Sequence, residues 1–478
     1  VRADRLEKSG ATFAAKRLHE GTEALRSRDN WFRPVFLAHG PDDALYVADM
    51  YRGAIEHPVY LPDEVRKRTD FTAGKDKGRI WRLRSASAPR KAGASRLAGR
   101  VSSELAREFR SPVAWRRETA FRLLLERLDP EPLADIRRLW KDPATPSAGR
   151  CLALRWMDQV GQLDGPTLVS ALRDADPNVR RHAVELAGAL LGNEGGASAT
   201  NRPPSTLPQE LTRLAQDPDP QVRFQSALAL AGRPGGEVLE SLAQIAARAP
   251  SDPYTQAAVL AAVDPRDGLR QLLPAFLRKA SPKVAGCPAF LLEWARLLAR
   301  GLPDAELPLA LKSMLLMSGS EGLESRCALF GGFMDGVGTR RETALSGDAL
   351  ELARPLFREA AEAAGKESLP VEQRMRALLV LASDASPVSG RALLSCLAVP
   401  VPELQKSAVR ALASPVHQAG VSQVFEAERW ARYSPSARHA ILVTFSQQPS
   451  LAAVLLDAVR SEEHTSELQS RGLISYAV

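Results

Sequence analysis

The chain has 478 residues, of which 45% are hydrophobic and 25% charged, and these proportions are typical of globular proteins. They exclude a disordered or collagen-like chain, and the length is sufficient for about three domains. The net charge of +8 lies entirely within residues 1–100, which carry 21 Lys and Arg against 13 Asp and Glu. Because residues 101–478 have no net charge, most of the chain lacks the basic excess typical of helical arrays that bind nucleic acid.

Hydropathy and cysteine spacing exclude two further classes of protein. The longest apolar run near either end covers residues 451–459, far fewer than the roughly 20 residues of a membrane helix, so no transmembrane segment is expected. The four cysteines are too far apart for CxxC metal clusters or a CxxCH haem attachment motif. We expect all four to be small hydrophobic residues buried in helices, namely Cys151, Cys287, Cys327 and Cys396.

The first 85 residues divide into two parts. Residues 1–28 are expected to be a partly helical or irregular lead-in without recognisable chemistry. Residues 29–85 contain short β-type runs at 34–39, 44–49 and 78–84, separated by Gly, Pro and Asp. These runs predict about three strands, which are too few for a stable sheet unless something covers their faces.

A linker rich in Ser, Ala, Pro and Lys occupies residues 86–102, and residues 103–459 then show only helical periodicity. Within this region, residues 192–205 are predicted to be a flexible insertion between helices because they are rich in Gly, Ser and Pro. The pattern is hardest to read over residues 300–366, where residues 331–348 are interpreted as a Gly-rich connection.

Two helical segments, residues 174–191 and 217–232, contain the same Asp-Pro-x-Val-Arg motif, with Val179 and Val222 separated by 43 residues. Weaker copies at intervals of 30 to 43 residues extend the repeat to roughly eight to ten helix pairs. In each clear copy an Asp is predicted to cap the helix and the following Pro to occupy the first helical position, at Asp176–Pro177 and Asp219–Pro220. One apolar stripe is then predicted along the first of these helices, at Val179, Ala183, Leu186 and Leu190.

The period, the caps and the Asp and Val-Arg residues resemble HEAT-type repeats over about residues 103–458. The resemblance implies an α-solenoid of stacked antiparallel helix pairs, with a concave face that could hold a protein partner. It also implies that Arg116, Arg180 and Arg223 bridge neighbouring repeats through a capping Asp, which is a structural role. The expected fold is therefore mostly α, a HEAT-like α-solenoid preceded by a short β segment.

Residues 29–83 (DNWFRPVFLAHG…KGRIWRL) closely resemble the end of the β-propeller in the membrane-bound dehydrogenases of planctomycetes and verrucomicrobia. That propeller is similar to soluble quinoprotein glucose/sorbosone dehydrogenases. In the family it runs into HEAT-like repeats and then usually into a c-type cytochrome domain. The resemblance implies that residues 29–85 are a terminal propeller blade. One departure is Asp43, at a turn position where the family usually has Gly.

The same resemblance implies a parent protein of the periplasm or cell envelope that uses pyrroloquinoline quinone with calcium, and haem c in its cytochrome domain. The chain opens without Met, and residues 460–470 (RSEEHTSELQS) are similar to a translated sequencing adapter. We therefore expect residues 460–478 to be an assembly artefact, and the gene to be cut at both ends.

Residues of possible chemical importance lie between positions 33 and 57, near the ends of the predicted strands. Two arginines there could bind an anionic or quinone ligand through charge-assisted hydrogen bonds, and an Asp could orient one of them. The alternative is that Asp49 and Arg52 close a turn and that His39 is a satisfied strand-end residue. The cofactor-binding candidates are Arg33, His39, Asp49, Tyr51, Arg52 and His57. No catalytic residue and no metal ligand is predicted, because the known sequence motifs for both are absent.

Three functions remain open at this stage. The first is a helical-repeat scaffold fragment of an exported, dehydrogenase-like electron-transfer protein, inactive by itself, whose partners are the missing propeller blades and cytochrome domain of the same parent chain. The second is a free-standing HEAT-repeat module for protein–protein interaction. The third is a nucleic-acid-binding helical repeat protein, which the charge distribution does not favour.

Overall fold

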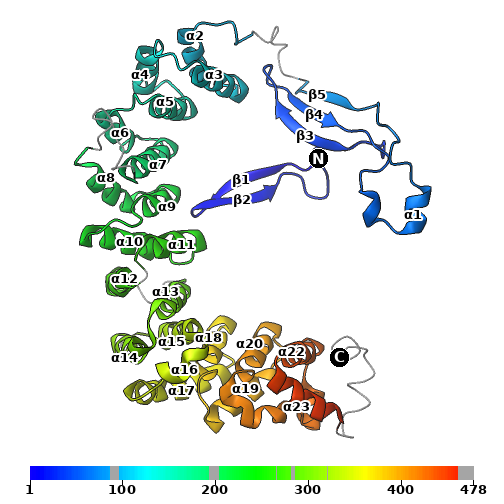
Figure 1. The fold of residues 1–478 in the computed structure, drawn as a ribbon, viewed down its shortest axis with the longest axis vertical. Helices are drawn as coiled ribbons and strands as arrows, with labels where there is room; N and C mark the ends of the chain where they lie inside the picture. The colour runs from blue at the N-terminus through cyan, green and yellow to red at the C-terminus, as the bar shows by residue number, and fades with distance from the viewer. Residues whose placement is uncertain (87–95, 193–203, 265, 281–285, 320, 461–478) are drawn as a thin grey trace. The chain divides into compact units, whose positions relative to one another are not determined.

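The computed structural model describes residues 1–478 except 87–95, 193–203, 265, 281–285, 320 and 461–478. It divides into two compact units, Val1–Leu230 and Ala231–Val478, which are described separately. The described residues are mainly helical, and their strands lie between residues 4 and 83, which confirms the mostly α fold (Figure 1). Three predictions lie largely outside the described residues: the linker (86–102), the flexible insertion (192–205) and the artefact (460–478).

The first unit begins with a β-hairpin, so the prediction of a partly helical or irregular lead-in was wrong. Strands β1 (Asp4–Ser9) and β2 (Thr12–Arg17) pair antiparallel, with Ser9 opposite Thr12. The two-residue loop between them contains Gly10 at φ +57°, a backbone conformation that glycine adopts without a steric penalty. Gly10 therefore allows the tight turn that this hairpin requires.

The predicted strands in residues 29–85 form one antiparallel sheet with β4 in the middle (Figure 1). The strands are β3 (Pro34–His39), β4 (Leu45–Asp49) and β5 (Arg79–Leu83). The connection from β4 to β5 contains a 3₁₀ turn, η1 (Pro58–Tyr60), and the short helix α1 (Asp63–Arg68). Phe36 and Ile80 lie on the same face of the sheet, both opposite Ala48, and are 67% and 72% exposed. Within the described part of the chain, this apolar face is therefore exposed to solvent.

The remainder of the first unit consists of helix pairs in which alternate helices lie side by side. Helix α3 contacts α5, α5 contacts α7, and α7 contacts α9 (Figure 1). The α-helices are α2 (Ser102–Arg107), α3 (Ala114–Arg127), α4 (Leu133–Lys141), α5 (Ser147–Gln159), α6 (Gly165–Ala171), α7 (Pro177–Gly192), α8 (Leu207–Arg213) and α9 (Pro220–Ala229).

The capping predicted for α7 and α9 is confirmed. Pro177 and Pro220 are the first residues of the two helices. The Asp176 carboxylate accepts a hydrogen bond from the backbone N–H of Asn178 at 2.8 Å. The Asp219 carboxylate accepts one from the backbone N–H of Gln221 at 2.9 Å. Both carboxylates therefore satisfy amide groups of the first turn, which have no partner within the helix.

The apolar stripe of α7 is confirmed for three of its four residues. Val179, Ala183 and Leu186 are buried, whereas Leu190 is half-buried and the adjacent Leu191 is buried instead. The stripe drifts by one position at its end because a helical turn has 3.6 residues, not a whole number.

The regular secondary structure of the second unit consists of helices, with no strand among its described residues. Its α-helices are α10 (Gly236–Arg248), α11 (Pro253–Ala262), α12 (Asp267–Lys279), α13 (Cys287–Gly301), α14 (Leu307–Met317), α15 (Leu323–Val337), α16 (Arg341–Ala344), α17 (Asp348–Gly365), α18 (Val371–Leu381), α19 (Pro387–Leu397), α20 (Pro402–Leu412), α21 (Ala427–Arg432), α22 (Pro435–Ser446) and α23 (Pro449–Arg460).

The interpretation of residues 331–348 as a Gly-rich connection was wrong for its first seven residues, which belong to α15. Gly332 and Gly336 lie one turn apart in this helix. A Cβ atom at Gly332 would lie 2.1 Å from the carbonyl oxygen of Leu292, and one at Gly336 would lie 2.3 Å from that of Arg296. Both oxygens belong to α13, so these glycines allow two helices to approach closely.

The four cysteines are buried in helices, as predicted, and none of them forms a disulfide within the described part of the chain. Burial raises the pKa of Cys151 to about 11 and that of Cys327 to about 12. These thiols are therefore protonated at neutral pH and are not activated nucleophiles. In the described part of the chain, no helix is long and apolar enough to cross a membrane.

Candidate functional site

Asp49, at the end of β4, is the centre of the polar contacts in the three-stranded sheet. Its side chain is fully buried. One carboxylate oxygen accepts hydrogen bonds from the backbone N–H groups of Arg33 at 2.8 Å and Tyr51 at 3.0 Å. The other accepts from the guanidinium of Arg79 at 3.1 Å and the indole N–H of Trp81 at 3.0 Å. The carboxylate thus joins β4 to the start of β3 and to β5.

The electrostatics of this centre favour the ionised carboxylate. Burial opposes ionisation of Asp49, but the hydrogen bonds from Arg33, Trp81 and Arg79 outweigh it, and the pKa of Asp49 is lowered. The guanidinium of Arg79 also stacks on the ring of Tyr51, with its carbon 3.8 Å from the ring centroid. Tyr51 has φ +48°, a left-handed conformation that directs the chain sharply away from β4.

The structure brings together some of the predicted site residues and separates others. Arg33, Asp49 and Tyr51 meet at one end of the sheet, and the side chain of the adjacent Arg52 donates to the carbonyl oxygen of Thr72 at 3.3 Å. His39 lies at the other end, opposite Leu45.

His57 lies apart from the sheet. It caps the 3₁₀ turn η1, where its ring nitrogen accepts from the backbone N–H of Val59 at 3.3 Å. The six candidates therefore do not converge on one point.

Two of the six candidates, Asp49 and Arg33, already have hydrogen-bond partners within the chain. Asp49 accepts four hydrogen bonds, and the guanidinium of Arg33 donates to the carbonyl oxygens of Asn30, Phe32 and Gly53. No group of three or more His, Cys, Asp or Glu able to hold a metal ion occurs among the described residues. This arrangement does not fit pyrroloquinoline quinone with calcium, and it closes a turn instead.

Arg79 and Trp81 were not selected from the sequence, although they are the two side-chain donors to Asp49. The feature that reveals them is the register between β4 and β5. In this register Asp49 lies opposite Arg79, and Val47 lies opposite Trp81. An antiparallel pairing of the 44–49 and 78–84 runs would have placed both side chains on the face of Asp49.

Replacing Asp49 with Ala is expected to destabilise the sheet by about 2–3 kcal/mol, because four donors lose their shared buried acceptor. Limited proteolysis should then cleave residues 29–85 faster, while helical circular dichroism stays unchanged. His39→Ala is the matched control, because His39 is an exposed residue of the same sheet. Equal protease resistance of both variants and the wild type would contradict the role assigned to Asp49.

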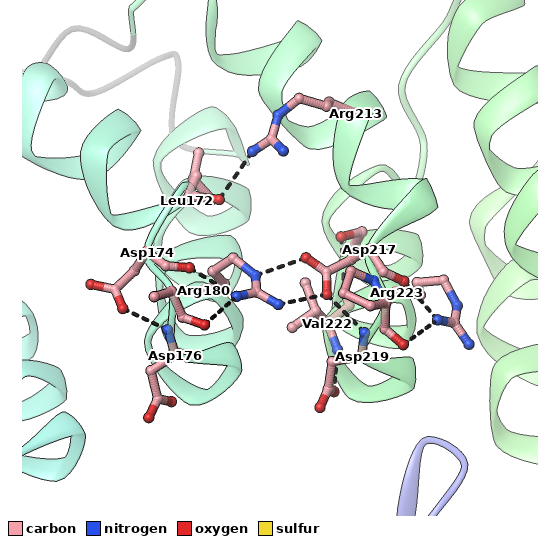
Figure 2. Close-up of polar contacts among 12 residues, drawn as sticks. Leu172, Asp174, Asp176, Arg180, Arg213, Asp217, Asp219, Val222 and Arg223 are labelled. Carbon is pink, nitrogen blue, oxygen red and sulfur yellow. Dashed lines mark hydrogen bonds and ion pairs between the residues drawn. The ribbon is translucent and has the colours of Figure 1, made fainter.

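The second cluster of charged residues joins neighbouring helix repeats (Figure 2). The guanidinium of Arg180, at the start of α7, donates two hydrogen bonds of 2.8 Å to the two carboxylate oxygens of Asp217, which precedes α9. A third bond, also 2.8 Å, goes to the carbonyl oxygen of Asp174 in its own repeat. The side chains of Arg180 and Asp217 are only 11% and 4% exposed. This bidentate pair fixes the register between the two repeats.

The same arrangement occurs one repeat earlier. Arg150, in α5, forms an ion pair with Asp174. Asp174 accepts from the backbone N–H of Asp176 at 2.8 Å, just as Asp217 accepts from that of Asp219 at 2.9 Å. Each of these aspartates therefore shapes the turn before a cap and also binds the arginine of the preceding repeat.

The predicted bridging role is confirmed for Arg180 with one change, since its acceptor lies two residues before the capping Asp219. Arg223 donates to the carbonyl oxygen of Asp217 at 2.7 Å, within its own repeat (Figure 2). Arg116 forms its ion pair with the buried Glu108. All three guanidinium groups hold helices in place.

Comparison with known protein families gives two matches. A model of HEAT repeats matches residues 165–263, which include α7, α9 and the Arg180–Asp217 pair. A model of a domain of unknown function, DUF7133, matches residues 1–87, which include both β-sheets. No curated protein matches the chain. The HEAT-like helical fold is thereby confirmed, and it is the architecture of a helical-repeat scaffold or protein-interaction module.

Proposed function

We propose that the chain is the interaction scaffold of an exported, dehydrogenase-like electron-transfer protein and has no enzymatic turnover of its own. The observation that carries the scaffold function is the row of HEAT-type helix pairs, whose buried arginines and aspartates are used to join repeats. Repeats of this kind present extended surfaces for other proteins.

The connection to a dehydrogenase rests on the sheet formed by residues 34–83. Its resemblance to a terminal propeller blade motivates the proposal, and its exposed Phe36 and Ile80 support it, because a propeller blade packs such a face against the next blade. In this proposal the other blades and a cytochrome domain belong to the same parent chain. Pyrroloquinoline quinone with calcium, and haem c, would be held there.

Sequencing the gene on both sides of the coding segment, from independent genomic DNA, tests this proposal directly. Further propeller blades are expected upstream, and a domain with a CxxCH motif is expected downstream of residue 460. A start codon with a ribosome-binding site immediately upstream of Val1 would overturn the dehydrogenase assignment. The free-standing interaction module would then be the better description.

The absence of turnover is a separate prediction. Catalytic groups must be held within a fraction of an ångström, and a propeller site takes them from several blades. Incubation of the chain with pyrroloquinoline quinone and calcium, followed by dye reduction with aldoses and alcohols, should give no rate above a protein-free control. Turnover that disappears in an Arg52→Ala variant would show that the site lies within this chain.

A further inference from the structure

A cavity of about 910 Å³ lies within the second unit, between α16, α17 and the turn that leads into α19. Most of its lining is apolar, and the side chains responsible are Leu345, Leu350, Phe357, Val388 and Val416. Leu350 and Val388 are themselves exposed, so the cavity opens to the surface. A hollow of this size and composition can accept one or two apolar side chains of a ligand.

Three arginines line the same cavity: Arg341, Arg354 and Arg358. Arg341 is half-buried and donates to the carbonyl oxygen of Ala382 at 3.1 Å and the hydroxyl of Ser414 at 3.2 Å. Within the described part of the chain, no carboxylate lies within ion-pair distance of Arg341 or Arg358. Burial lowers the pKa of Arg341, and the negative charge of Asp335 opposes this shift only in part. Arg354 forms an ion pair with the exposed Glu351, at 3.1 Å.

Two acidic residues also line the cavity, and within the described part of the chain neither forms an ion pair with these arginines. Asp384 accepts hydrogen bonds from the hydroxyl groups of Ser386 and Ser389, in the turn that begins α19. Glu342 is exposed. The lining thus carries three cationic and two anionic side chains, and within the described residues the guanidinium groups of Arg341 and Arg358 have no carboxylate in ion-pair contact.

Ser383 supplies an independent indication of a ligand. It lines the cavity and is only 6% exposed, yet its hydroxyl has no hydrogen-bond partner among the described residues. A buried hydroxyl without a partner is destabilising, and a bound group that accepts a hydrogen bond from it would remove this cost.

We propose that this cavity binds an acidic peptide segment of a partner protein, with its carboxylates at Arg341 and Arg358 and an adjacent apolar side chain in the hollow. The inference rests on the proposed interaction function and names the chemistry of the partner. A peptide fits better than a phosphate or nucleic acid because the apolar lining would leave a purely charged ligand without contacts over most of the cavity.

A second cavity, of about 560 Å³, differs from the first in the state of its arginine. It lies beside Trp294 and Leu309 and is also mostly apolar, but the arginine that lines it, Arg270, already forms an ion pair with Glu306. Its charge is satisfied within the chain, so it gives no indication of the chemistry of a partner.

The experiment uses the whole chain and a fluorescein-labelled hexapeptide, capped at both ends, in which Glu alternates with Leu and Phe. The matched probe carries Gln in place of Glu. Fluorescence anisotropy should show binding of the Glu peptide below 1 mM and at least about tenfold weaker binding of the Gln peptide. No binding of the Glu peptide at 1 mM, or equal binding of both peptides, would overturn the proposal.

Variants then locate the site. Arg358→Glu should weaken binding of the Glu peptide by about tenfold or more. Arg391→Glu should change binding less than twofold, because Arg391 is an exposed arginine of α19 that does not line the cavity. Equal losses in both variants would show a non-specific charge effect and contradict the site.

Ser383→Ala separates ligand binding from folding. We expect it to weaken binding of the peptide about threefold without lowering the melting temperature. The hydroxyl has no hydrogen-bond partner among the described residues of the unbound chain, so its removal breaks no such bond there. Displacement of the peptide by inorganic phosphate or a short oligonucleotide at equal concentration would assign the cavity to phosphate groups instead. The two proposals can fail separately. If the peptide does not bind but the flanking DNA encodes propeller blades, the cavity proposal is wrong and the scaffold proposal is unaffected.

Discussion

Replacing Val179 with Asp is expected to lower the free energy of unfolding of the first unit by about 4 kcal/mol or more. Val179 is completely buried on α7, in the apolar stripe of that helix. An aspartate there would place a carboxylate where water cannot reach it. The nearest guanidinium along the chain, that of Arg180, is already bound to Asp217 on two sides and cannot serve as its partner.

Urea unfolding followed by circular dichroism measures this loss, and hydrogen–deuterium exchange locates it. Because repeat arrays can open locally, exchange should rise in α7 and α9 before it rises in the second unit. Ala189→Asp is the matched control, since Ala189 is exposed on the same helix and should cost only about 0.5–1 kcal/mol. Equal stability of the Val179→Asp variant and the wild type would show that the repeat register is wrong.

The features predicted successfully from the sequence are those decided by neighbouring residues. An Asp that caps a helix and the Pro that follows it act within one turn, so Asp176–Pro177 and Asp219–Pro220 indicate where α7 and α9 begin. The buried stripe headed by Val179 follows from helical periodicity alone. The repetition of this pattern then indicates HEAT-type pairing, because each helix pair needs a similar neighbour to cover its apolar stripe.

The features that were missed depend on contacts between distant parts of the chain. Asp49 is among the candidates predicted from the sequence, but its partners Arg79 and Trp81 lie 30 or more residues away along the chain. They can be identified only when the register between β4 and β5 is known. The acceptor of Arg180 differs from the prediction for a related reason: it is Asp217, two residues before the capping Asp219. The carboxylate that meets a guanidinium across two repeats depends on the path of the turn, which Asp217 itself shapes.

Glycine was the residue type most often misinterpreted. The sequence analysis does not predict a hairpin turn at Gly10, and it places Gly332 and Gly336 in a Gly-rich connection between helices. In both cases the absence of a Cβ atom is what matters, once for a positive φ and once for close helix packing. Composition alone does not distinguish these uses from a loop, because the difference lies in the atoms of α13 that α15 contacts.

Replacing Gly332 with Ala is therefore expected to destabilise the second unit by about 3 kcal/mol. The added methyl group would lie 2.1 Å from the carbonyl oxygen of Leu292, which is a backbone atom of α13 and cannot rotate away. The two helices must separate, and the buried contacts along both of them are weakened together. The helix propensity of Ala, which exceeds that of Gly by about 1 kcal/mol, offsets only part of this cost.

Gly390→Ala is the control that separates packing from propensity. Gly390 lies in α19, and a Cβ atom there would have no neighbour within 4 Å. This variant should become more stable by about 0.5–1 kcal/mol, because only the propensity gain applies. Differential scanning calorimetry of both variants checks the opposite signs, and hydrogen–deuterium exchange should rise in α13 and α15 for Gly332→Ala alone. Stabilisation by both substitutions would mean that α13 and α15 do not pack this closely.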